Sequence, residues 1–117
     1  MGLNGEGYGI SNESGTMGAI TNIGVISGYG SSLDTGSGYG IHNGSSATMG
    51  TITNTGVIYG TSNAINRDNE SIDPSSNYGI LVNGDSNNDV VDGLDIVDET
   101  PEAKQILNKG LIFKAVV

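Results

Sequence analysis

The residues best suited to chemistry are acidic, and seven of the chain's 13 acidic residues lie in the segment from Asp85 to Glu102. Asp85, Asn87 and Asp89 have the spacing of the first, third and fifth positions of an EF-hand calcium loop. The match then ends, because valine stands where such loops have glycine and isoleucine where they have the final glutamate. We therefore expect a solvated acidic loop and no bound metal.

Paired carboxylates can also cleave polysaccharides, with one carboxyl group on each side of the glycosidic bond. Asp92, Asp95 and Asp98 are the candidates for that role. No cluster of Lys or Arg accompanies them, and the Asn-Thr-Asp and Gly-His-Gly signatures of pectin hydrolases are absent from the sequence. We therefore expect no catalysis and no cofactor, and we assign the three aspartates to a loop that contacts a partner.

The scaffold that carries these residues is repetitive. Residues 17–28, MGAITNIGVISG, return as residues 49–60, MGTITNTGVIYG, and the copies differ only at the positions of Ala19, Ile23 and Ser27. An active site needs one copy of a motif, whereas a structural unit that stacks on itself needs several. The repeated segments are short, rich in β-branched residues and bounded by Gly, Asn and Ser, so they predict strands.

Other segments extend the repeat through the whole chain, which we take as a single domain, 1–117. Each Asn-x-Gly predicts a sharp corner, because Asn and Gly tolerate a positive φ. The copies match at a spacing of 31 to 32 residues, while a coil of about 21 residues is an alternative. The further copies are GYGI at 7–10 and 38–41, YGI at 78–80, and QILNKGLIF at 105–113, and they define units 7–37, 38–75 and 76–117.

This pattern predicts an all-β fold, a right-handed parallel β-helix (β-solenoid) of about three to four coils. Successive coils place equivalent residues above one another, about 4.8 Å apart. We expect the amides of Asn22, Asn54 and Asn108 to form a hydrogen-bonded ladder along the axis. The expected interior stacks are Ile10 with Ile41 and Ile80, Ile20 with Ile52 and Ile106, and Ile26 with Ile58 and Ile112.

Aromatic residues head the first strand of each unit. Tyr8, Tyr39 and Tyr78 are expected to stack as a column, which serves packing more often than ligand binding. His42 follows Ile41, so the alternation of a strand predicts that His42 points outward into solvent.

The acidic insertion, 85–102, lengthens the third unit and contributes no residue to the expected stacks. Length changes of this kind are tolerated in surface loops, so we expect the insertion to leave the solenoid as a projecting loop and to be replaceable by a short turn. Its VVDGLDIVD segment, residues 90–98, alternates enough to form a short strand.

The segments AITNIGVIS and TITNTGVIY resemble the passenger regions of Gram-negative type V autotransporter adhesins, whose β-solenoids carry recurrent GTITNSGTISG-like coils. The resemblance covers residues 7–60 well and residues 76–84 and 105–113 less completely. It implies display outside the cell, on the bacterial surface, by a structural and adhesive spacer that binds a host-surface protein or glycan. The sequence has neither the signal peptide nor the C-terminal membrane barrel of that family. The resemblance therefore implies an internal fragment, held at a membrane only through a barrel that lies elsewhere.

Composition narrows the classes of partner. The net charge is −9 and no Lys or Arg precedes Arg67, so nucleic acid is not an expected partner. The absence of cysteine excludes disulfides and thiolate metal sites. Open coil edges invite self-association. Two other classes stay open from the sequence: a carbohydrate-active β-helix enzyme, and a phage or fibre assembly module.

Overall fold

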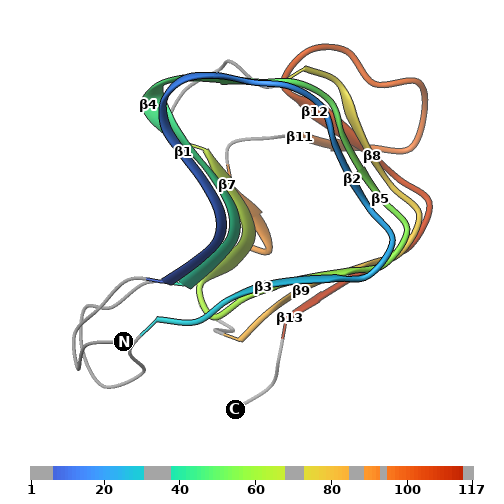
Figure 1. The fold of residues 1–117 in the computed structure, drawn as a ribbon. Coiled ribbons are helices and arrows are strands. Elements are labelled where there is room, and N and C mark those ends of the chain that lie inside the picture. The colour runs from blue at the N-terminus through green and yellow to red at the C-terminus, as the bar shows by residue number, and fades with distance from the viewer. Residues whose placement is uncertain (1–6, 31–37, 68–72, 85–88, 93–94, 115–117) are drawn as a thin grey trace.

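The computed structural model describes residues 7–30, 38–67, 73–84, 89–92 and 95–114 (Figure 1). The described residues form β-strands and no helix, and every pairing between the strands is parallel. The strands assemble into three sheets, which we call A, B and C. The prediction of an all-β fold with parallel strands is confirmed.

The sheets are built from strands that are far apart in the sequence. Sheet A has the order β1 (Gly7–Met17), β4 (Gly38–Met49), β7 (Asn63–Arg67) and β10 (Val91–Asp92). Sheet B has the order β11 (Asp95–Val97), β12 (Gln105–Asn108), β8 (Ser75–Asn77), β5 (Ile52–Asn54) and β2 (Ile20–Asn22). Sheet C has the order β13 (Leu111–Lys114), β9 (Ile80–Asn83), β6 (Val57–Gly60) and β3 (Val25–Gly28).

The chain passes through sheets A, B and C in turn and then returns to sheet A, as the nested ribbons of Figure 1 show. We call β1, β2 and β3 the first layer, β4, β5 and β6 the second, and β7, β8 and β9 the third. The fourth layer is β10, β12 and β13, and β11 lies beyond it, on the free side of β12. Parallel strands need a long crossover, and here the other two sheets supply it.

The interior is a column of aliphatic side chains between the three sheets. In the first two layers the expected stacks form: Ile10 pairs with Ile41, Ile20 with Ile52, and Ile26 with Ile58. A single layer cannot enclose its own apolar side chains, so each depends on the layers above and below it. Among the described residues, the apolar side chains without measurable exposure are Ile41, Ile52, Ile58, Ala64, Ile65, Leu81 and Ile106.

The third layer differs from the prediction. Ile80 does not stack on Ile41, because it lies in β9 of sheet C and pairs with Val57. The residue beside Ile41 is Ile65 of β7, and Val91 of β10 follows it. The stretch of chain from Ile41 to Ile65 is shorter than the stretch from Ile10 to Ile41, so the third layer is reached by a shorter path than the second.

The two other stacks also contain residues that the prediction left out. Ser75 lies between Ile52 and Ile106 in sheet B, where its hydroxyl accepts a 3.0 Å hydrogen bond from the Ile52 amide. Leu81 lies between Ile58 and Ile112 in sheet C. Ile106 is fully buried despite its polar neighbour, because the stack continues from the other side.

The asparagine ladder forms and has one more member than expected. Asn22 donates from Nδ2 to Oδ1 of Asn54 at 2.8 Å, Asn54 donates to Asn77 at 2.8 Å, and Asn77 donates to Asn108 at 2.9 Å. Asn54 and Asn77 have no exposed surface. Buried amides are stable only when they are hydrogen-bonded, so the ladder fixes the corner between sheets B and C in every layer.

From the second layer on, the glycines of the Asn-x-Gly corners are required for space and not for a positive φ. Among the described residues only Lys104 and Gly15 have a positive φ. A Cβ on Gly56 would lie 2.0 Å from the carbonyl oxygen of Gly24, and one on Gly110 would lie 2.1 Å from that of Gly79. The close approach of successive layers therefore selects glycine at this position.

The acidic insertion leaves the stack only in part: residues 98–104, between β11 and β12, form a largely exposed loop outside the sheets (Figure 1), whereas the start of its described part belongs to the core. Val90 and Val91 are 4% and 6% exposed and belong to the hydrophobic core. Val91 pairs with Ile65, so β10 supplies the sheet A strand of the fourth layer. The expected short strand is present, as β10 and β11, and Val90 and Val91 complete the core, whereas Ile96 is half exposed.

Candidate functional site

The partial calcium motif is described only at Asp89, because Asp85 and Asn87 lie outside the described residues. Asp89 is exposed and lies 3.9 Å from the Lys114 ammonium, its ion-pair partner. In the described part of the chain no three His, Asp or Glu side chains are grouped closely enough to hold a metal ion.

The three candidate aspartates lie on different features. Asp92 is on β10, where its Oδ2 accepts a 3.0 Å hydrogen bond from Nδ2 of Asn66. Asp95 lines a pocket at the end of the stack, and Asp98 lines a separate hollow of about 650 Å³ together with Glu99 and Glu102. The three aspartates therefore do not line one common pocket.

Asp92 ends a polar row on sheet A. His42, Asn66 and Asp92 are in register on β4, β7 and β10. Nδ1 of His42 lies 2.8 Å from Oδ1 of Asn66, whose amide group then donates to Asp92. An amide oxygen can only accept, so this contact places a proton on Nδ1 of His42.

Aromatic rings surround His42, which is 6% exposed and not the exposed residue that strand alternation predicted. Its ring is stacked on Tyr39 at a centroid distance of 5.2 Å and lies 5.1 Å from the ring of Tyr8. Tyr8 and Tyr39 stack on each other at 5.6 Å, as expected. Tyr78 is not part of the column, because it is exposed at the corner between β8 and β9.

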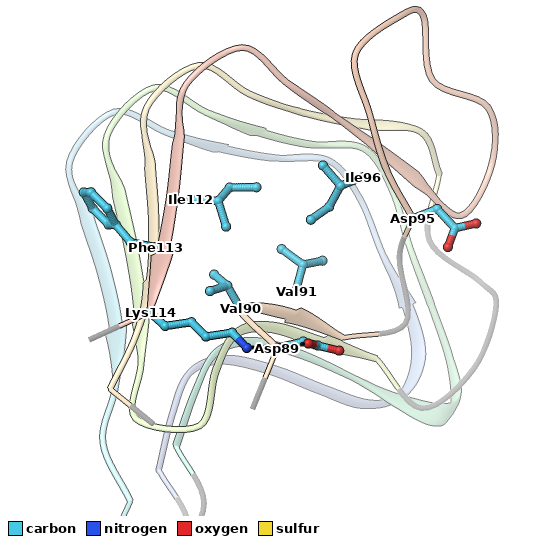
Figure 2. A pocket seen from close by; sticks show the side chains of 8 residues that line it. All are labelled: Asp89, Val90, Val91, Asp95, Ile96, Ile112, Phe113 and Lys114. Atoms are coloured by element: carbon cyan, nitrogen blue, oxygen red, sulfur yellow. Dashed lines mark ion pairs between the residues drawn. The ribbon is translucent and has the colours of Figure 1, made fainter. Parts of the chain in front are cut away.

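A pocket lined mainly by apolar residues lies at the end of the stack that the fourth layer forms. The pocket has a volume of about 400 Å³ and is lined by the eight residues drawn in Figure 2. Val90, Val91, Ile96 and Ile112 point into the space between the sheets, whereas Asp95 and Phe113 point away from it (Figure 2). Asp89 and Lys114 lie together at one side of the opening.

At this pocket the interior column reaches solvent. Ile96 of β11 pairs with Ile106 of β12, yet Ile96 is 51% exposed while Ile106 is fully buried. The pocket has charged groups at its rim and aliphatic groups inside, so its surface is amphipathic. The sequence analysis proposed Asp95 as a partner contact, which stays a prediction. It did not single out the apolar residues beside Asp95, whose signal was the alternation in residues 90–98.

The fold and this end pocket define a class: an all-β protein of three parallel sheets with an apolar, acid-rimmed opening at one end of its core. Comparison of the chain with protein-family models, curated proteins and solved structures finds no match. No helix within the described ranges is long and apolar enough to cross a membrane.

Proposed function

We propose that the chain is a structural and adhesive segment of a bacterial cell-surface autotransporter passenger, displayed outside the cell and without catalytic activity. The observation that carries the proposal is the in-register stacking of near-identical motifs, such as Ile20, Thr21 and Asn22 on Ile52, Thr53 and Asn54. The same motifs carry the resemblance to the passenger regions of autotransporter adhesins. The finer architecture that we propose is a right-handed solenoid of four coils, each coil being one layer of strands.

A stack of this kind suits a spacer, because it can be lengthened by repetition without a change in cross-section. Adhesion then requires a surface at which a partner binds. We assign this role to the acidic residues at this end of the stack, Asp92, Asp95 and Asp98, with a host-surface protein or glycan as the partner. Residues on a rigid scaffold lose little conformational entropy when a partner binds them.

The experiment is an adherence assay with beads that carry the purified chain, applied to epithelial monolayers and to immobilised glycans. Coated beads should adhere above the level of albumin-coated beads, and the triple variant Asp92→Asn, Asp95→Asn, Asp98→Asn should reduce adherence. Adherence equal to that of albumin would contradict the adhesive role. Release of reducing sugar from polysaccharides by the purified chain would instead favour the carbohydrate-active class.

A further inference from the structure

We propose that the end pocket binds an extended peptide in which basic and apolar residues alternate, and that this peptide adds as a strand to the free edge of β11. The inference rests on the proposed function and deepens it, because it names the chemistry of the partner at the acidic end.

The first support is the free hydrogen-bonding edge. β11 is the terminal strand of sheet B, and among the described strands it pairs only with β12. Residues Asp95 to Val97 use one side of the strand for β12, so the backbone groups of the other side face away from the stack. An edge of this kind is the template for the addition of a peptide strand.

The second support is the apolar surface beside that edge. Ile96 continues the interior stack above Ile106, and its exposed half faces the pocket that Val91 and Ile112 also line. A strand added to β11 would place an apolar side chain over Ile96 and remove this surface from water. Burial of apolar surface supplies the affinity, while the backbone hydrogen bonds fix the direction of the peptide.

The third support is charge. Asp95 precedes Ile96 and points away from the pocket (Figure 2). In an added peptide strand, the residue next to the apolar one that covers Ile96 would therefore lie beside the Asp95 carboxylate. Asp89 also lines this end, and Lys114 is the one basic residue among the eight lining residues. A lysine or arginine at the facing position therefore complements the edge, and an acidic residue is repelled.

The same charges select against a second copy of this chain. No Lys or Arg precedes Arg67 in the sequence, so the layers at the opposite end of another molecule offer no positive charge to Asp95. Repulsion of the wrong partner is a common source of specificity at strand edges. The occupant that fits is thus a basic, amphipathic segment of a different protein.

The test is a titration of the ¹⁵N-labelled chain with an acetylated seven-residue peptide of alternating lysine and valine, followed by NMR. The amide signals of Ile96 and Val97 should shift with the signals of their neighbours. Two control peptides should cause no shift at the same concentration: one with glutamate in place of each lysine, and one with a central proline, which cannot pair as a strand.

Matched variants separate specific binding from general attraction. Asp95→Asn should weaken binding on the order of threefold and Ile96→Ser roughly tenfold. Glu13→Gln removes the same charge from the first layer and should leave the affinity unchanged. If the NMR spectrum of Ile96→Ser loses its dispersion, that variant has unfolded. The comparison of Asp95→Asn with Glu13→Gln then tests whether the peptide binds at β11.

Equal weakening by Asp95→Asn and Glu13→Gln, or shifts spread over all layers, would overturn the proposal, as would equal binding of the proline peptide. The outcome is independent of the adherence assay. Adherence without peptide binding would support the proposed function and contradict this inference. Peptide binding without adherence would support this inference and contradict the adhesive function.

Discussion

Asn54 donates a 2.8 Å hydrogen bond from Nδ2 to Oδ1 of Asn77, and this contact sets the position of the third layer of strands. The same Nδ2 group lies within hydrogen-bond distance of the carbonyl oxygens of Gly56 and Ile80. One buried side chain therefore ties its own corner to the corner of the next layer. Repetition of this contact along the stack makes the Asn-x-Gly corner, and not any apolar residue, the most constant feature of the repeat.

Replacement of Asn54 by leucine should lower the free energy of unfolding by about 3 kcal/mol, because it removes, inside the buried ladder, both the bond that Asn54 accepts from Asn22 and the bond that it donates to Asn77. The matched control is Thr53→Ala, one residue earlier and partly exposed. Urea denaturation of both variants measures the difference. Similar midpoints would show that the ladder contributes little to stability.

Replacement of Gly56 by alanine should destabilise the fold by about 2 kcal/mol or more, because the new Cβ would lie 2.0 Å from the carbonyl oxygen of Gly24. Gly24 itself occupies the same motif position in the first layer and has no atom within 4 Å of its Cβ position. Gly24→Ala should therefore be tolerated. Thermal melts of the two variants compare one motif in two layers, and equal melting temperatures would contradict the close stacking of the corners.

Val91→Asp should cost several kcal/mol of stability, because it buries an unpaired carboxylate in the core of the fourth layer. Ile52→Asp should have a comparable effect in the second layer, where Ile52 is fully buried. Thr53→Asp, on the outward side of the same strand, should cost little. If Val91→Asp behaved like Thr53→Asp in urea denaturation, the acidic insertion would lie outside the core, as the sequence alone suggested.

Stability should fall above the ordinary pKa of tyrosine. Burial, and then the neighbouring Tyr29, raise the pKa of Tyr59. At pH values between the ordinary and the raised pKa, the folded chain retains a proton that the unfolded chain has lost, so folding weakens as the pH rises. Urea midpoints from about pH 9 to about pH 11 should show this fall, and Tyr59→Phe should reduce it. The exposed Tyr78→Phe is the control, and an equal reduction by both variants would contradict the assignment.

Self-association at high concentration remains a prediction, and the first layer is its best site. β1 is the terminal strand of sheet A, spans 11 residues and contains one charged side chain, Glu13. A long edge with so little charge favours pairing with a second copy. Ser14→Glu would place like charges opposite each other in a symmetric pair, whereas Ser45→Glu, on the inner strand β4, should have no effect. Sedimentation velocity measures both, and a monomer at every concentration would contradict the prediction.

The sequence by itself determined the repeat, the parallel β architecture and the register of the first two layers. These follow from local patterns: apolar residues at fixed spacing and Asn-x-Gly corners, which any coil must present in the same order. The first two copies are so similar that only one register aligns Ile10, Ile20 and Ile26 with their partners.

Tertiary structure alone decided the third layer. The Tyr-Gly-Ile of residues 78–80 matches the start of β1 and β4, but Asn77 and Gly79 also match the corner motif, and the two assignments are incompatible. The chain adopts the second, because Asn77 then completes a buried hydrogen-bonded ladder, which outweighs a likeness of three residues. Because Asn77 takes the corner position, the third layer is formed by a shorter stretch of chain than the second, and β7 is its sheet A strand.

The end pocket likewise could not be derived from spacing. Val90, Val91 and Ile96 lie in an acidic stretch that the repeat does not predict, and the burial of Val90 and Val91 depends on the exposed apolar end that the third layer leaves. Local composition therefore indicated a solvated loop. In the structure, apolar residues of this stretch instead pack on Ile65 and Ile106, because this packing removes apolar surface from water.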